Sequence, residues 1–397
     1  MRFEALKAEH GDCLLLTFDG PSRKHRLVVD GGPNSKTGAT LMARLDKDRA
    51  GMERNDALPI DAIMISHIDN DHVRGINALF KELGDREGNS RPWPWRPRWL
   101  LHNSFDDLVD EPSGGAARVV GGETVLAARG AGLLALGGLG KGPDEDLLKV
   151  LQGYPDGSKL SSRAAGLRIP RNPPSQSVLV CDMANPLIFR IGDTRVTIVG
   201  PLLAQVEGLR REWEKWKAGQ DVKETYPSQG FPEGMDRSIT NLSSVVALVE
   251  DQGHRVLLTG DALGTLVVDG LRELGLLDGN GQIAVDILKL PHHGSERNID
   301  KRLLTSVIAR HYVVSGDGNY GNPDRGTLDR IEELCPHDLT LHLTYSAAQC
   351  DAGHAAYLLG RGKSFDAATQ GIVPVVERWR SSGANITVIE ESAGIDL

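Results

Sequence analysis

The chain has few cysteines, and none of them lies near another in sequence. Four occur in 397 residues, namely Cys13, Cys181, Cys335 and Cys350. A disulfide framework or a cysteine zinc knuckle needs regularly or closely spaced cysteines, so this pattern argues against both. Cys13, at the start of the apolar run Cys13–Leu16, is expected in the core.

Long apolar runs are also missing. No stretch approaches the roughly 18 to 20 consecutive apolar residues that a membrane-spanning helix needs. The first segment, Met1–Lys7, alternates charged and apolar residues and lacks the apolar region of a signal peptide. The sequence therefore predicts a cytoplasmic protein that does not contact a membrane.

An excess of positive charge is the third feature that the sequence lacks. The formal net charge is −9, from 45 basic and 54 acidic residues, which argues against coating nucleic acid by bulk electrostatics. A local nucleic-acid groove stays open, because one segment has the residues to stack bases and hold phosphates: Arg91, Trp93, Trp95, Arg96, Arg98 and Trp99. The prolines in the same segment equally fit a stiff connector whose tryptophans pack on the protein body.

What the sequence does contain is a dense group of potential metal ligands. The apolar run Ala62–Ile65 is followed at once by His67, Asp69, Asp71 and His72. Side chains at alternate positions of an extended chain project the same way, and the turn adds His72. The apolar residues after Gly75 recur at helical spacing, so the group is expected between a strand and a helix. A polar turn whose histidines only hydrogen-bond locally is the alternative.

Two further strand ends carry the same residue types. Asp261 follows Gly260 after a predicted strand, and His292 and His293 follow the buried strand Val285–Leu290. Ligands that close separate strands can meet at one sheet edge. A dinuclear site prefers a carboxylate that bridges both ions, and Asp261 is the natural candidate. The other histidines lack a neighbouring ligand and are expected at the surface or in the core.

The strand and helix pattern predicts a layered α/β protein. Strands are expected at 13–18, 26–29, 62–65, 187–190, 194–199, 245–249, 256–259, 285–290 and 312–315, with helices at 263–274 and 301–309. Residues 1–397 are predicted to form one domain. Within it, 104–180 is expected to be a Gly/Pro-rich insertion or lid, and 202–217 a charged helical arm.

These motifs resemble the metallo-β-lactamase fold and, more narrowly, the hydrolase domain of the DNA-uptake protein ComEC. The resemblance rests on Asp30-Gly31-Gly32, the His67-to-His72 motif, Leu258–Asp261 and Leu288–Ser295, with Gly11-Asp12 and Asn241–Val245 in support. It covers about 1–90 and 185–350. The fold that it implies is a four-layer αββα sandwich with a dinuclear metal centre at its edge.

The resemblance also implies roles for individual residues. The implied metal ligands are His67, Asp69, Asp71, His72, Asp261, His292 and His293. Asp71 is expected to orient the attacking hydroxide between two divalent ions, while Asn322 or Ser295 steadies a substrate oxygen. Lys289 is expected to face a sheet interface or assist.

Two positions depart from the common family pattern. Asp69 stands where most members have histidine, which hardens the site and makes manganese or magnesium more competitive with zinc. Asn322 stands where the family commonly has histidine, which would weaken one metal position.

The function expected first is a metal-dependent phosphodiesterase or nuclease. Hydrolysis of a small ester, thioester or nucleotide is the second hypothesis. The third is a catalytically weak metal-binding subunit of a larger assembly, such as a prokaryotic defence system.

Overall fold

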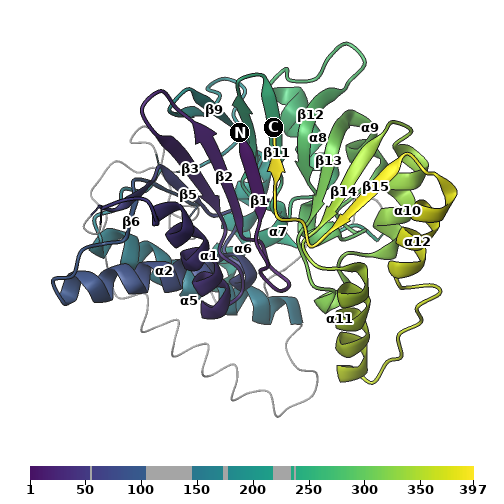
Figure 1. The fold of residues 1–397 in the computed structure, drawn as a ribbon, viewed down its shortest axis with the longest axis horizontal. Coiled ribbons are helices and arrows are strands. Elements are labelled where there is room, and N and C mark those ends of the chain that lie inside the picture. The colour runs from purple at the N-terminus through teal and green to yellow at the C-terminus, as the bar shows by residue number, and fades with distance from the viewer. Residues whose placement is uncertain (54–55, 104–144, 173–177, 218–233, 237) are drawn as a thin grey trace.

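Two β-sheets face each other between two groups of helices in this computed structural model (Figure 1). The structure describes residues 1–53, 56–103, 145–172, 178–217, 234–236 and 238–397. The first and last strands, β1 (Arg2–Ala5) and β16 (Ile395–Asp396), pair with each other, so the two ends of the chain lie side by side.

The first sheet has six strands in the order β16-β1-β2-β3-β5-β7. Its central strands alternate between two apolar faces: Leu14 and Leu16 of β2 face the second sheet, and Leu15 faces the helices. This alternation is the period of two expected for a strand buried on both sides. The remaining strands are β2 (Leu14–Asp19), β3 (Lys24–Val29), β5 (Ala62–Met64) and β7 (Leu100–Leu101).

The second sheet has eight strands in the order β15-β14-β13-β12-β11-β10-β9-β8. Neighbouring strands from β8 to β11 pair antiparallel, and those from β11 to β15 pair parallel. The strands are β8 (Ile188–Ile191), β9 (Thr194–Gly200), β10 (Val246–Asp251), β11 (His254–Leu258), β12 (Ile283–Lys289), β13 (Val307–Val314), β14 (Leu339–Leu343) and β15 (Ile386–Glu390).

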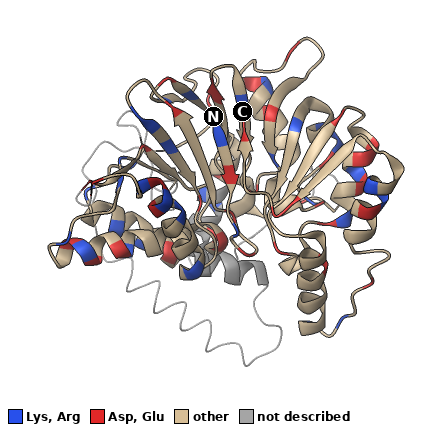
Figure 2. Ribbon diagram, viewed as in Figure 1, with Lys and Arg blue, Asp and Glu red and all other residues tan. Residues whose placement is uncertain are grey.

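Helices cover the outer face of each sheet, which confirms the predicted four-layer αββα sandwich. One apolar cluster joins the first sheet to α1 (Ser35–Arg49), α2 (Asn70–Gly88) and α5 (Glu145–Gly166). Another joins the second sheet to α8 (Gly264–Glu273), α9 (Lys301–Ser306), α10 (Arg325–Leu334) and α12 (Val373–Ser382). A third cluster lies between the sheets. Both signs of charge are spread over the outer helices (Figure 2).

Close backbone approaches place the start of α2. A Cβ atom added at Gly75 would lie 1.7 Å from the carbonyl oxygen of Gly31, and one added at Gly11 would lie 2.0 Å from the carbonyl oxygen of Asp71. Neither position has room for a side chain, so glycine lets the helix start press against the loops after β1 and β3. This contact sets where Asp71 and His72 lie.

One predicted element needs correction. The helix expected over 301–309 ends at Ser306, and residues 307–309 belong to β13. Their side chains alternate in burial, as a strand requires, and Val307 and Ala309 enter the core. The segment 104–180, expected to be an insertion or lid, contains α5, whose Leu160 and Ala164 pack with the α2 cluster. Residues 104–144 and 173–177 lie outside the described part.

The predicted charged arm corresponds to α6 (Leu203–Lys217), whose first turn buries Val206. The side chains of Leu209, Trp213 and Trp216 lie outside the described residues, so the predicted aromatic edge stays a prediction. Among the described residues, no helix is both long and apolar enough to cross a membrane. The cytoplasmic location stays a prediction.

Candidate metal centre

The predicted ligands meet where three strands end. His67 follows β5, Asp261 follows β11, and His292 and His293 lie in the short 3-10 turn Pro291–Gly294 after β12. Strands β11 and β12 are parallel neighbours, so their carboxyl ends lie at the same sheet edge. The first turn of α2 contributes Asp71 and His72 from the first sheet.

One carboxylate oxygen lies at the centre of this group. The Oδ2 atom of Asp261 is 3.8 Å from Nε2 of His67, 3.5 Å from Nε2 of His72, 3.6 Å from Nε2 of His292 and 3.7 Å from Nε2 of His293. Four imidazoles from both sheets therefore face the same carboxylate. This arrangement suits a carboxylate that bridges two cations.

The two further carboxylates extend the group in different directions. Asp71 lies with Oδ2 3.6 Å from Nε2 of His293 and Oδ1 3.8 Å from Nε2 of His72. Asp69 lies with Oδ2 3.7 Å from Nε2 of His67. The structure thus gathers all seven residues that the sequence analysis named as metal ligands.

The opposite nitrogen of each ring contacts a second residue. The Nδ1 atom of His72 is 2.9 Å from Oδ2 of Asp30, that of His293 is 3.2 Å from Oδ1 of Asp12, and that of His292 is 2.9 Å from Oδ1 of Asn298. The Nδ1 atom of His67 lies 3.1 Å from the hydroxyl of Ser66. Such partners fix the ring orientation and the tautomer of metal-binding histidines.

The inner atoms of the group fit a bound cation. The Nε2 atoms of His67, His72 and His293 and the Oδ1 atom of Asp261 are buried and have no hydrogen-bond partner among the described residues. Leaving buried polar atoms unsatisfied costs free energy, and proteins avoid it. Ligand atoms of Asp71, His72, Asp261 and His293 all lie within 4.8 Å of one another, close enough to share one ion.

The charges of the cation-free site favour metal binding. Burial lowers the pKa of His67 to about 4, so this ring is neutral and ready to coordinate. Burial also lowers the pKa of His292, but the carboxylates of Asp261 and Asp236 outweigh burial and raise it to about 9. The charges of His72 and His293 keep the pKa of Asp71 below its ordinary value despite burial. A cation would therefore meet ionised carboxylates and displace a proton from His292.

The backbone that presents the paired histidines is strained. His292 has φ 48° and His293 has φ 55°, both in the left-handed region that residues with a side chain seldom adopt. Two such residues in succession cost free energy, which the surrounding contacts must supply. The conformation turns both rings toward Asp261, so the strain lies where the ligands are placed.

Two residues predicted to steady a substrate oxygen, Ser295 and Asn322, make contacts within the loops around the paired histidines. Ser295 lies with its hydroxyl 3.4 Å from Oδ2 of Asp324, and Asn322 donates through Nδ2 to the carbonyl oxygen of His292 at 3.2 Å. Both contacts brace the loops around the paired histidines. Their roles in catalysis stay predictions.

No role was predicted from the sequence for the residues that hold the rings: Asp12, Asp30, Asp236, Asn298 and Ser244. Asp12 belongs to the motif Gly11-Asp12 and Asp30 to the motif Asp30-Gly31-Gly32, so their place beside glycines was the sequence signal for a role near the site. Asp236 and Asn298 had no sequence signal. Lys289, which was expected to face a sheet interface or assist, is buried with its ammonium group 2.9 Å from Oδ2 of Asp12.

The model of the family described as "Metallo-beta-lactamase superfamily" matches residues 7–224, more than half of the chain. The chain belongs to this superfamily. Its members are mostly metal-dependent hydrolases, and this chain has a His/Asp cluster that could hold a divalent metal ion. The narrower resemblance to the ComEC hydrolase domain is not shown by this match.

Three solved structures are similar to this chain at low sequence identity. Zn²⁺-bound PqqB from Methylobacterium extorquens is 12% identical, with a TM-score of 0.38 and 100% of each chain covered. An archaeal metallo-beta-lactamase superfamily protein from Sulfolobus tokodaii is 12% identical, with a TM-score of 0.24, 68% of this chain covered and 73% of that chain. A protein of unknown function from Enterococcus faecalis V583 is 12% identical, with a TM-score of 0.29, covering 90% of this chain and 67% of that one. Comparison with curated proteins gave no match.

Proposed function

We propose that the protein is a metal-dependent phosphodiesterase whose centre is organised by Asp261. The observation that carries the proposal is the position of its Oδ2 atom, which lies 3.5–3.8 Å from Nε2 of four histidines. Three carboxylates share the site with these rings. Such an oxygen-rich donor set makes manganese competitive with zinc, and both suit phosphoryl transfer.

Two sets of residues would hold two divalent ions. Asp71, His72 and His293 form one set with Asp261. His67, Asp69 and His292 form the other, again with Asp261. When bound, a pair of ions supplies an activated water and stabilises negative charge on the attacking and leaving oxygens.

The exposure of the side chains supports an approach of the substrate from the side of Asp71 and His292. The Asp71 side chain is 25% exposed and the His292 side chain is 28% exposed, whereas those of His67, His72, His293 and Asp261 are nearly buried. Asp71 therefore meets both the ligand cluster and solvent. Its ionised carboxylate is placed to orient a water molecule and accept its proton.

Aromatic residues line the same region. His10 lies near enough to Asp71 for the carboxylate to raise its pKa, although burial has the larger effect and lowers it. The His10 ring packs edge-on against Tyr320 with ring centroids 5.0 Å apart, and Tyr320 is 49% exposed with a left-handed φ of 61°. An exposed ring held in a strained backbone beside the centre suits a substrate that has a flat group next to the scissile phosphate.

The test compares ester classes on protein reconstituted with manganese or zinc. We expect hydrolysis of bis(4-nitrophenyl) phosphate, little hydrolysis of 4-nitrophenyl acetate, and a loss of kcat of at least 100-fold in Asp71→Asn. Asp193→Asn, an exposed carboxylate away from the site, is the matched control and should behave as wild type. Hydrolysis of the acetate alone would indicate a small-ester hydrolase. No hydrolysis with less than one metal per chain would indicate a non-catalytic metal-binding member.

A further inference from the structure

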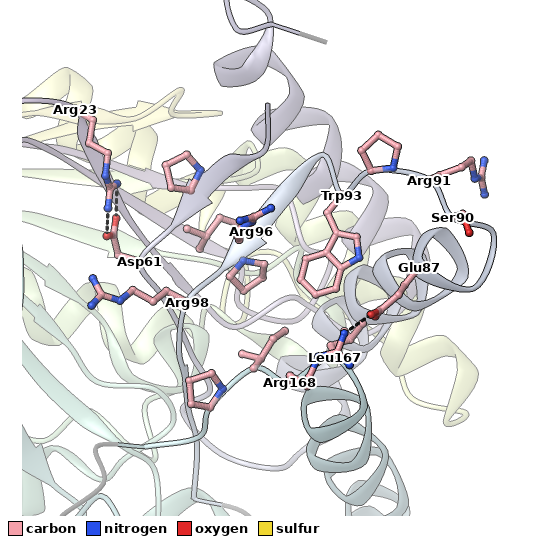
Figure 3. A pocket seen from close by; sticks show the side chains of 16 residues that line it. Arg23, Asp61, Glu87, Ser90, Arg91, Trp93, Arg96, Arg98, Leu167 and Arg168 are labelled. Atoms are coloured by element: carbon pink, nitrogen blue, oxygen red, sulfur yellow. Dashed lines mark hydrogen bonds and ion pairs between the residues drawn. The ribbon is translucent and has the colours of Figure 1, made fainter. Parts of the chain in front are cut away.

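A hollow lies at the far end of α2, away from the metal centre. It has a volume of about 760 Å³ and is lined by residues from β4 (Leu58–Ile60), β6 (Trp95–Pro97) and the ends of α2 and α5 (Figure 3). Helix α2 carries Asp71 at one end and Glu87, which lines the hollow, at the other. A rise of about 1.5 Å per residue separates these two residues by roughly 24 Å. The hollow is therefore a separate site.

Its charge is opposite to that of the whole protein. Five arginines and two acidic residues, Asp61 and Glu87, line it, so its formal charge is +3 in a chain whose net charge is −9. Arg23 pairs with Asp61, and Arg168 donates to Glu87 at 2.6 Å. The exposed guanidinium groups of Arg91, Arg96 and Arg98 make no hydrogen bond or ion pair with any residue that the structure describes. Three charge-bearing donor groups are thus available to an anionic ligand.

One aromatic ring faces these arginines. The half-buried indole of Trp93 lies between Arg96 and the Glu87–Arg168 pair in Figure 3. Of the other predicted stacking residues, Trp95 is buried and donates through Nε1 to Asp46 at 3.1 Å, and Trp99 packs against the core between the sheets. Only Trp93 of the three is placed to stack with a ligand in this hollow.

Two further hollows continue this one along the surface. A hollow of about 650 Å³ shares Arg91 and Pro92 with it, and another of about 360 Å³ shares Asp61 and Arg98. The neighbours add three arginines, one carboxylate and two tryptophans to the lining: Arg49, Arg86, Arg190, Asp46, Trp95 and Trp99. The three together form a basic track, defined here by Arg91, Trp93, Arg96 and Arg98 at its centre. A track suits an extended polymer better than a compact small molecule.

We propose that this basic track binds a segment of single-stranded nucleic acid. Guanidinium groups of Arg91, Arg96 and Arg98 would contact successive phosphates, and one base would stack on Trp93. The free arginines supply the charge and Trp93 supplies the flat contact, which is the combination that binds single strands with little sequence preference. The inference concerns binding alone and goes beyond the proposed hydrolysis at the metal centre.

The test measures binding of a fluorescent 20-nucleotide single strand by anisotropy, in chelator so that no cleavage occurs. The double variant Arg96→Gln with Arg98→Gln should weaken binding at least tenfold at low salt. It should also reduce the slope of log affinity against log salt by about 1.4, since each phosphate contact on a single strand contributes about 0.7. Trp93→Leu should weaken binding about tenfold with the salt slope unchanged.

The matched control is Arg255→Gln with Arg310→Gln, which removes two exposed charges from the opposite sheet. It should change the affinity less than twofold. Equal losses in the two double variants would overturn the proposal, as would a wild type that does not bind the strand. Equal competition by polyglutamate would show a general polyanion surface, and equal competition by free mononucleotide would show a nucleotide pocket. Either result would also overturn it.

Hydrolysis of bis(4-nitrophenyl) phosphate separates this proposal from the proposed function. That substrate is too small to reach from the metal centre to the basic track. The Arg96→Gln/Arg98→Gln variant should therefore hydrolyse it at the wild-type rate. Strand binding without hydrolysis would refute the phosphodiesterase alone, and hydrolysis without strand binding would refute the track alone.

Discussion

The ammonium group of Lys289 lies 2.9 Å from Oδ2 of Asp12, and both side chains are buried. The other oxygen of the same carboxylate is 3.2 Å from Nδ1 of His293. Lys289 thereby compensates the charge of the group that orients a metal ligand. It acts through Asp12 and is a positioning residue.

Lys289→Met should destabilise the protein by about 3–5 kcal/mol, because it leaves the Asp12 carboxylate buried without a counter-charge. Urea unfolding measures the change, and Lys301→Met, at an exposed lysine, serves as control. Adding Asp12→Asn to Lys289→Met should recover part of the loss. A single variant as stable as the control would show that the pair contributes nothing.

Gly75→Ala should weaken metal binding and lower stability, because the new Cβ would lie 1.7 Å from the Gly31 carbonyl oxygen. The start of α2, with Asp71 and His72, would have to move. Gly84→Ala lies in the same helix, with its nearest neighbour 4.0 Å away, and should stabilise the protein by about 0.5–1 kcal/mol. Thermal unfolding and metal titration of both variants check this difference between Gly75→Ala and Gly84→Ala. Equal stability and equal metal affinity in the two variants would show that the close approach at Gly75 does not position the ligands.

Asp30→Asn should lower metal affinity by about 10- to 100-fold. Asp30 accepts from the backbone N–H and the hydroxyl of Ser66 and contacts Nδ1 of His72, so the substitution removes the charge that makes His72 a stronger ligand. Competition with a metal-binding dye gives the affinity, with Asp193→Asn as control. Unchanged affinity would mean that Asp30 only supports the loop.

Stability should fall in mild acid partly through His102. Burial lowers the pKa of this histidine to about 3, whereas its ordinary value is 6.5. Between these values the unfolded chain binds a proton and the folded protein does not, so stability drops by up to about 1.4 kcal/mol for each pH unit below 6.5.

His102→Leu should remove this contribution, and it loses no side-chain hydrogen bond to the described residues. Urea unfolding at pH 7.5 and pH 5 should show a smaller loss for the variant than for wild type. His254→Gln, at a partly exposed histidine, should keep the wild-type pH dependence. The same loss in all three proteins would refute the assignment.

The sequence predicted the layers and the ligand cluster because both depend on local patterns. Apolar residues mark the strands that come before and after Asp261 in the sequence, and each ligand lies within four residues of a strand end or a helix start. Asp236 and Asn298 hold His292 from separate loops, and no periodicity marks such contacts. The basic track was predicted with three tryptophans. Only the fold shows that Trp95 is buried while Trp93 and Trp99 stay partly exposed, because burial depends on partners distant in sequence.

The central claim is that Asp261 joins two sets of ligands around two divalent cations. Elemental analysis of wild type and Asp261→Asn, purified from medium supplied with zinc and manganese, tests it most directly. We predict two cations per wild-type chain and at most one in the variant. Less than one cation per wild-type chain, or equal metal content in the two proteins, would contradict it.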